Sequence, residues 1–191
     1  MDDRAHGEPP RRFVIVSGMP GAGKSTLAFK LSHELGNFPV IDKDDIFENL
    51  YGTKTAFDAA RRSDVSRAAD SLMRREAEAS SRAILVSHWR RTEISETSGT
   101  PIEWLFDLPN AVEIYCSCDP EIAVSRFLSR HRLGAHGDQL VIRDRLRIQL
   151  RSIQELGPIG FPSLLVVDTS REVDLPAIAD ELVSIWRSPQ F

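Results

Sequence analysis

The sequence predicts a single three-layer α/β/α domain in which helices cover both faces of a five-stranded parallel sheet. Three observations carry this prediction. Short apolar runs alternate with longer helical segments along the chain, which is the order of elements in parallel α/β folds. The first apolar run, residues 13–17, is followed by a glycine, as expected for a buried strand. The length of 191 residues, with 41% hydrophobic and 27% charged residues, suits one globular domain.

Helices are predicted between the apolar runs. Residues 25–35 form the first helix, closed by Gly36, and residues 44–50 form a short second helix before Gly52. The charged, alanine-rich segment 56–80 predicts one or two surface helices. Further helices are expected at 120–130, at 139–156 up to Gly157, and at 175–186, with a flexible break at 133–137. The predicted strands are residues 13–17, 38–42, 83–87, 111–116 and 164–168.

The charge, the apolar runs and the cysteine content of the chain limit which partners and which location we expect. Residues 1–11 are expected to be a flexible tail, and residues 12–191 one domain. The net charge of −4, from 24 Lys+Arg and 28 Asp+Glu, makes nucleic acid an unexpected partner. No apolar run reaches the length of a membrane span, and the polar first residues lack a signal-peptide core. Cys116 and Cys118 are too close for an unstrained disulfide and too few for a zinc site. These features predict a cytoplasmic protein with no membrane partner.

The segment from Gly18 to Ser25 fits the phosphate-loop motif G-x-x-x-x-G-K-S/T in full. Its glycines let backbone N–H groups surround phosphate oxygens, and the following helix adds a positive N-terminus. Lys24 is expected to reach the β- and γ-phosphates of ATP, and the Ser25 hydroxyl to bind Mg²⁺. The predicted nucleotide-binding residues are Gly18, Pro20, Gly21, Ala22, Gly23, Lys24, Ser25 and Thr26.

Other motifs separate the classes of nucleotide enzyme. A guanine switch protein needs Asn-Lys-x-Asp, but none of the three asparagines is followed by lysine, and an Asp-x-x-Gly segment is missing too. Asp168 follows the last predicted strand, at the expected sheet edge, so we interpret it as a turn former and not as the acid of a motor ATPase. Asp42, Asp44 and Asp45 follow the second strand, on the ligand-binding side of a doubly wound sheet. A kinase needs a carboxylate there to orient an acceptor hydroxyl, although a helix cap also favours Asp at this place.

The motif Gly-Met-Pro-Gly-Ala-Gly-Lys-Ser-Thr followed by Ile41-Asp42-Lys43-Asp44 resembles the P-loop kinases related to zeta toxins, chloramphenicol phosphotransferase and polynucleotide kinase. The resemblance covers most of residues 13–170 and is specific in the first ~35 of them. It implies an adenylate-kinase-like fold with Asp44 as the catalytic base. Asp42 and Asp45 are the alternatives for the base, and Asp42 would lie nearer the metal beside Ser25.

Residues 126–139 resemble the arginine-bearing lid of adenylate-kinase-like enzymes, with Gly134 and Gly137 giving it freedom to close. This resemblance implies that Arg126, Arg130 and Arg132 stabilise the transferred phosphoryl group. After the third strand no acid follows directly, and Arg90 or Arg91 is interpreted either as an acceptor ligand or as a solvated surface residue. Asp168-Thr169-Ser170 resembles the turn near the adenine in these kinases.

The sequence therefore predicts an ATP- and Mg²⁺-dependent phosphotransferase that acts on a hydroxyl of a small molecule. The alternatives are a nucleic-acid end kinase, a zeta-type toxin kinase acting on a nucleotide sugar, and an ATP-binding regulatory module without transfer. Segments 45–80 and 88–105 should build the acceptor pocket, but they match no motif that names the acceptor, and a protein partner is not predicted. The aromatic residues there could line an apolar pocket or belong to the core, and they are Phe47, Tyr51, Phe57, Trp89 and Trp104.

Overall fold

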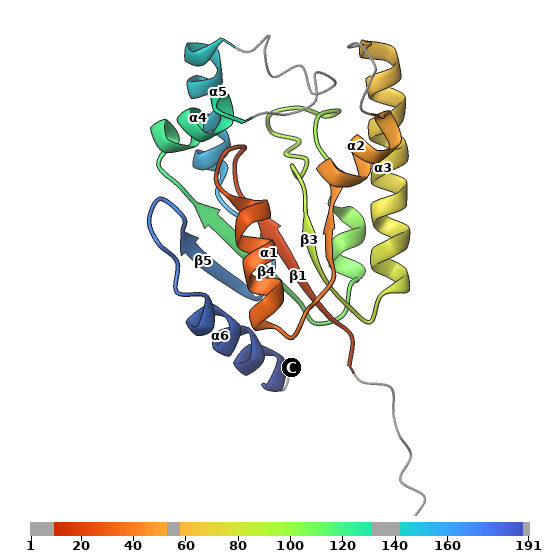
Figure 1. Cartoon of the computed structure of the whole chain (residues 1–191), viewed down its shortest axis with the longest axis vertical. Helices are drawn as coiled ribbons and strands as arrows, with labels where there is room; N and C mark the ends of the chain where they lie inside the picture. Colours follow the sequence, from red (N-terminus) through yellow and green to blue (C-terminus); the bar gives the residue numbers. More distant parts are fainter. Residues whose placement is uncertain (1–9, 53–57, 131–141, 189–191) are drawn as a thin grey trace, which may run out of the picture.

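The computed structural model describes residues 10–52, 58–130 and 142–188, which form an α/β/α sandwich (Figure 1). All five strands run parallel in the order β2-β3-β1-β4-β5. The predicted three-layer fold with a five-stranded parallel sheet is therefore confirmed. The strands are β1 (Arg12–Ser17), β2 (Val40–Asp42), β3 (Arg82–Val86), β4 (Ala111–Ser117) and β5 (Leu164–Asp168).

The helices follow the predicted order with shifted ends. α1 and α6 cover one face of the sheet, whereas α3 and the short 3₁₀ helix η1 cover the other (Figure 1). The predicted surface segment is a single helix, α3, of 21 residues. η1 was not predicted, because five residues are too few to show a helical period. The helices are α1 (Lys24–Glu34), α2 (Lys43–Tyr51), α3 (Ala59–Ala79), η1 (Glu103–Asp107), α4 (Pro120–Leu128), α5 (Arg143–Leu156) and α6 (Leu175–Arg187).

The central strand β1 alternates its side chains between two cores. Val14 and Val16 pack with the apolar side of α1, whereas Phe13 and Ile15 pack toward α3 and η1. All four side chains are fully buried. A strand buried on both faces needs such a continuous apolar run, which is why this segment was recognisable from sequence. β1 thereby holds the loop after it at the centre of the sheet edge.

The start of β2 and the start of α2 differ from the prediction, and the second difference changes the position of Asp44 in the site. β2 ends at Asp42 as predicted, but it begins at Val40, and α2 begins at Lys43 instead of Asp44. Asp42 is the N-cap of α2, since its side chain accepts a hydrogen bond from the Asp44 N–H. The side-chain alternation of a strand therefore does not extend to Asp44.

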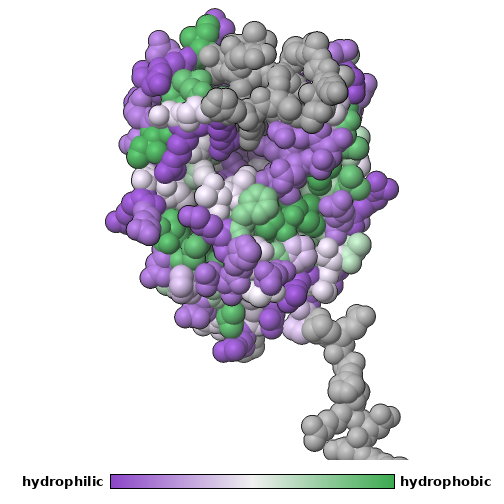
Figure 2. Space-filling view, viewed as in Figure 1, coloured by the Kyte–Doolittle hydropathy of each residue, from purple (hydrophilic) through white to green (hydrophobic). Residues whose placement is uncertain are grey.

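The outer surface is mostly hydrophilic on the face shown in Figure 2, where hydrophobic residues form separate groups. Within the described ranges, no helix combines the length and the apolar character that crossing a membrane requires. Cys116, in β4, and Cys118, just after it, are free and buried. Burial raises the pKa of the Cys116 thiol to about 12, so this thiol stays protonated.

Candidate active site

The loop between β1 and α1 has the tight course that its glycines permit. Gly18 and Gly21 have φ angles of 129° and 84°. A Cβ at Gly18 would lie 2.6 Å from the Cys116 carbonyl oxygen, and one at Gly21 would lie 2.2 Å from that of Ala123. No side chain fits in either place, because real Cβ atoms do not approach carbonyl oxygens so closely. The loop is therefore seated directly on β4 and α4.

Lys24 lies at the first position of α1 and folds back over the loop. Its Nζ donates hydrogen bonds to the carbonyl oxygens of Gly18 at 2.9 Å and of Met19 at 3.1 Å. Burial lowers the pKa of Lys24 to about 8, an effect that the nearby Asp44 carboxylate partly offsets. The ammonium group is thus held within the phosphate loop beside an acid of α2, as the motif predicts for a lysine that meets the β- and γ-phosphates.

Ser25 and Asp42 connect the loop to β2. The Ser25 hydroxyl donates to Asp42 Oδ2 at 2.6 Å, while Asp42 Oδ1 caps α2. Asp42 is only 5% exposed, and this burial raises the pKa of its carboxyl group. Hydroxyl and carboxylate oxygens are the hard ligands that Mg²⁺ prefers, so these residues fit a magnesium ion. Among the described residues no three His, Cys, Asp or Glu side chains form a metal-binding group, so nucleotide oxygens and water would supply the other ligands.

A cavity of about 490 Å³ opens beside the phosphate loop. Gly21, Gly23 and Thr26 line it from the loop and α1, and Thr169 lines it from the turn after β5. The Thr169 hydroxyl lies 2.7 Å from the Ala22 carbonyl oxygen, which fixes the turn after β5 against the loop. The volume is in the range of small-molecule sites. We refer to it as the nucleotide cavity.

Two of the three predicted lid arginines line the nucleotide cavity. Arg126, in the last turn of α4, donates to the Thr169 carbonyl oxygen at 3.0 Å, so it is part of the cavity wall. Arg130 follows the C-cap of α4, and its charge contributes to lowering the Lys24 pKa. Arg132 and most of the predicted lid, with His131 and His136, lie outside the described residues.

A second cavity, of about 520 Å³, lies between α2, α3 and the chain after β3. We call it the acceptor cavity. Asp44 and Lys43 line it from α2, and Asp70 lines it from α3. Lys43 forms an ion pair with Asp70 at 2.6 Å, and Asp70 also accepts a hydrogen bond from the Thr100 hydroxyl at 2.7 Å. This network fixes the wall next to Asp44.

His88, directly after β3, is a site residue that the sequence reasoning missed. It lines the acceptor cavity, and its charge interactions with Lys24, Lys43 and Asp44 place it next to the phosphate loop. Burial and the two lysines lower the pKa of His88 to about 4, so its imidazole is neutral at neutral pH. Its position after β3 was the available signal, because the carboxyl ends of parallel strands meet at one edge.

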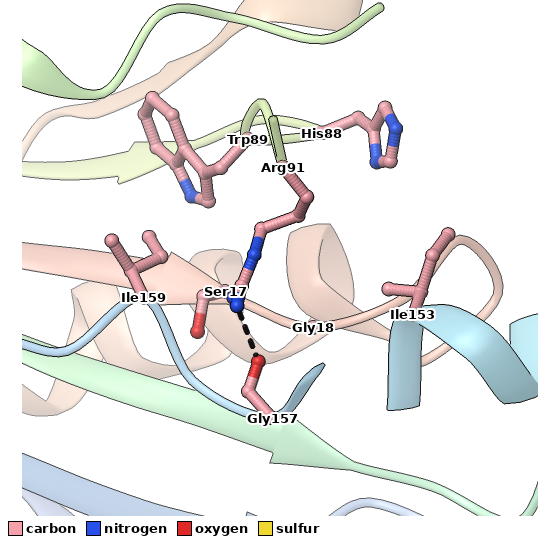
Figure 3. A pocket seen from close by; sticks show the side chains of 8 residues that line it. All are labelled: Ser17, Gly18, His88, Trp89, Arg91, Ile153, Gly157 and Ile159. Atoms are coloured by element: carbon pink, nitrogen blue, oxygen red, sulfur yellow. Dashed lines mark hydrogen bonds between the residues drawn. The ribbon is translucent and has the colours of Figure 1, made fainter. Parts of the chain in front are cut away.

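The two arginines after His88 have different surroundings, which the sequence could not distinguish. Arg90 lines the acceptor cavity. Arg91 instead extends across a cavity of about 20 Å³ and donates to the carbonyl oxygens of Gly157 and Pro158 at 3.0 and 2.8 Å (Figure 3). That volume holds one water molecule, not a substrate. Arg91 is therefore neither an acceptor ligand nor a solvated surface arginine, since it anchors the chain after α5.

Most of the described aromatic candidates belong to the core, which was one of the two interpretations that the sequence left open. Trp89 and Trp104 are buried in the core between the sheet and α3, and Tyr51 is buried between α2 and α3. The Trp89 indole N–H donates to the Val16 carbonyl oxygen at 2.8 Å. Phe47 alone of the described candidates lines the acceptor cavity, and Phe57 lies outside the described residues.

A phosphate loop at the centre of a parallel sheet, with a cavity on each side, defines a P-loop kinase fold. The chain belongs to the AAA domain family, whose model matches residues 17–140. This match spans the phosphate loop, the acid cluster and most of the lining of the acceptor cavity. A comparison with curated proteins found no match.

Solved structures show the same architecture. A putative kinase from Chloroflexus aurantiacus J-10-fl superposes with a TM-score of 0.69 and 23% identity, over 92% of this chain and 98% of that one. Shikimate kinase from Bacteroides thetaiotaomicron gives a TM-score of 0.58 and 15% identity, over 93% and 99%. Deoxyadenosine kinase from M. mycoides with bound dATP gives 0.55 and 19%, over 92% and 100%. These similarities show the fold and leave the acceptor open.

Proposed function

We propose that this protein transfers the γ-phosphoryl group of ATP to a hydroxyl group of a small molecule. One observation carries the proposal: Asp42 links the phosphate loop to the helix that presents Asp44, since it accepts from Ser25 and caps α2. Asp44 thereby lines the acceptor cavity and lies close enough to Lys24 to offset part of the lowering of the Lys24 pKa by burial. A carboxylate beside the phosphate lysine and facing a separate cavity is what phosphoryl transfer to a hydroxyl needs.

In this proposal the acceptor oxygen forms a bond to the γ-phosphorus as the bond from that phosphorus to the β–γ bridging oxygen breaks. Asp44 takes the hydroxyl proton, and ADP leaves with the electron pair of the broken bond. Lys24, Arg126, Arg130 and Arg132 interact with the negative phosphate oxygens. Mg²⁺ would be held by Ser25, whose hydroxyl is hydrogen-bonded to Asp42, and would neutralise charge on these oxygens. His88, neutral and beside the phosphate loop, positions the acceptor or the phosphoryl group.

The remaining predictions about the domain fit this proposal. Residues 126–139 would close over the nucleotide as a lid, residues 1–11 would be a tail, and residues 12–191 would form one kinase domain. An ATP-consuming enzyme with two free buried cysteines fits a cytoplasmic location. The relation to zeta toxins, chloramphenicol phosphotransferase and polynucleotide kinase stays part of the proposal, since the acid cluster after β2 supports it.

The test is ATP consumption with and without a panel of hydroxyl compounds, in the wild type and in Lys24→Ala. Acceptor-dependent ADP formation that disappears in Lys24→Ala supports the kinase. A regulatory module would bind ATP without acceptor-dependent turnover, and that result would contradict the proposal. Turnover only with nucleic-acid ends or with a nucleotide sugar would favour the two alternative kinases.

A further inference from the structure

The lining of the acceptor cavity is strongly polar. Phe47 is the single large apolar side chain among the residues that line it, and hydroxyl groups come from α3 and from the chain after β3. Four basic and three acidic side chains complete the wall. The hydroxyl residues are Ser63, Ser66, Ser87, Thr97 and Ser98; the charged ones are Lys43, Arg62, Arg67, Arg90, Asp44, Asp70 and Glu96. Such a wall suits a small, hydroxylated ligand and not an apolar one.

Resting on the proposed kinase function, we infer that the acceptor is a small polyhydroxy compound that carries an anionic group, a carboxylate or a phosphate, bound by Arg90. The argument depends on how the basic residues of the cavity are paired. Lys43 is paired with Asp70, and Arg67 forms an ion pair with Asp64. Lys43 is therefore neutralised within the cavity wall, whereas Arg67 is paired on the exposed surface of α3.

Arg90 has unused hydrogen-bond donors. In the described part of the chain its guanidinium makes one hydrogen bond, from Nη2 to the Gly99 carbonyl oxygen at 3.2 Å. Its Nε is buried and has no acceptor among the described residues. A buried N–H without an acceptor is unfavourable, and an anionic oxygen is the acceptor that a guanidinium binds best. Since Nε itself is shielded from the cavity, the ligand would supply that oxygen to the remaining Nη N–H groups.

The backbone holds Arg90 firmly at the cavity wall. The Arg90 N–H donates to the Thr100 carbonyl oxygen at 2.7 Å, and the Thr100 N–H donates to the His88 carbonyl oxygen at 2.8 Å. Gly99 lies so close that a Cβ there would be 2.8 Å from the His88 carbonyl oxygen. A side chain on such a fixed segment loses little further freedom on binding, which suits a residue that selects a substrate.

Arg62 adds a second cation to the same cavity. It lies in the first turns of α3, is exposed, and has no ion-pair partner within the described ranges. A polynucleotide could also bring phosphate groups, but it needs an extended basic track. Two other arginines of α3 pair with acids of the same helix, Arg67 with Asp64 and Arg74 with Glu78, so this helix does not present a continuous basic track. The cavity is therefore suited to a small acid.

The test uses matched pairs of acceptors: D-gluconate against D-glucitol, D-glycerate against glycerol, and glucose 6-phosphate against glucose. ADP formation is measured for wild type, Arg90→Gln, Arg90→Lys and the control Arg74→Gln, whose arginine lies outside the cavity.

We expect turnover with an acidic member and little with its neutral partner. Arg90→Gln should raise the KM for that acid ~10- to 100-fold, as for the loss of a charged hydrogen bond. The KM for ATP should stay within about twofold, Arg90→Lys should recover part of the loss, and Arg74→Gln should match the wild type. Preference for carboxylate or phosphate members identifies the anion.

The inference is overturned if the neutral members are turned over as well as their acids, or if Arg90→Gln leaves the KM for the acid unchanged. Calorimetric binding of the same acids in the presence of ADP separates this inference from the kinase proposal. Binding in wild type that is lost in Arg90→Gln, without turnover of any compound, supports the acidic ligand and contradicts the transfer reaction. If none of the acids binds or is turned over, the inference is wrong.

Discussion

The Ser25 hydroxyl donates a 2.6 Å hydrogen bond to the Asp42 carboxylate, which joins the first turn of α1 to the end of β2. Through its other oxygen, Asp42 also caps α2 and so fixes the helix that carries Asp44. One buried carboxylate thus sets the distance between the phosphate loop and the wall of the acceptor cavity. A change at Asp42 should therefore affect metal binding first, because the capping role survives substitution by asparagine.

Asp42→Asn should weaken binding of MgATP ~10-fold, as for loss of a charged partner behind a metal ligand. The free energy of unfolding should change little, because asparagine caps a helix as well as aspartate does. Calorimetric titration with MgATP and with ATP plus EDTA checks this. Without metal, the wild type and the variant should bind ATP equally. A difference that persists in EDTA would show that Asp42 does not act through the metal.

The lowered pKa of Lys24 predicts how ATP affinity depends on pH. Above pH 8 the free protein loses the Lys24 proton, and phosphate binding must take it up again, so affinity should fall by up to about tenfold per pH unit. Between pH 8 and 10.5 the unfolded chain binds more protons, so the free protein should gain stability as the pH rises. Calorimetry from pH 7 to 9.5 measures the affinity. In Lys24→Met this pH dependence should vanish, and a retained slope would assign it to another group.

Gly21→Ala should destabilise the protein more than Gly36→Ala does. Both glycines have positive φ angles, so both substitutions incur left-handed strain of ~1–2 kcal/mol. Only at Gly21 would the new Cβ meet a carbonyl oxygen, that of Ala123, since nothing lies within 4 Å of the site at Gly36. Chemical denaturation of both variants measures the difference. Equal losses would mean that the loop moves away from α4 without cost.

The sequence alone predicted those parts of the structure that are determined by residues close together in the chain. β1, the phosphate loop and α1 are contiguous, and their pattern is set by burial on both faces of the strand and by the tight course of Gly18 and Gly21. The parallel sheet followed from the alternation of elements. The end of β2 at Asp42 was also correct, because the apolar run stops there.

The acceptor cavity could not be predicted, because it depends on contacts between distant segments. Thr100 and Asp70 are 30 residues apart in the chain, and Arg91 binds carbonyl oxygens that follow it by more than 60 residues. Nothing in the run Ser87-His88-Trp89-Arg90-Arg91 shows which arginine faces the cavity. The start of α2 was misplaced by one residue for a related reason: each of the three acids in Asp42-Lys43-Asp44-Asp45 satisfies the capping pattern, and only the backbone course selects Asp42.

Substitutions of Arg126, in the last turn of α4, and of Arg130, just after this helix, should have different kinetic effects. Arg130→Ala should lower kcat by up to about 10³-fold with a small change in the KM for ATP, if its contact forms mainly in the transition state. Arg126→Ala should weaken ATP binding and lower the melting temperature, because Arg126 holds the Thr169 carbonyl in the wall of the nucleotide cavity. Steady-state kinetics and thermal unfolding distinguish the two. An Arg130 variant that changes only the KM for ATP would make it a ground-state phosphate ligand.

The last prediction concerns which acid after β2 is the base. Asp44 is half-buried in the wall of the acceptor cavity, whereas Asp45 is exposed in the first turn of α2. Asp42 is engaged with Ser25 and with the helix cap. Asp44→Asn should therefore leave ATP binding nearly intact and slow transfer ~10²–10⁴-fold, the usual contribution of a general base.

Asp45→Asn is the matched control, since it removes the neighbouring charge without touching the cavity. It should keep nearly full activity and cost about 1 kcal/mol, the usual contribution of an acid in the first turn of a helix. Single-turnover transfer to the acceptor, measured in both variants with ATP in excess of its dissociation constant, isolates the chemical step from binding. If Asp45→Asn abolishes transfer while Asp44→Asn stays active, Asp45 is the base and the assignment to Asp44 is wrong. Equal, small losses in both would mean that neither carboxylate takes the proton, and His88, neutral and next to both Lys24 and Asp44, would then be the group to test.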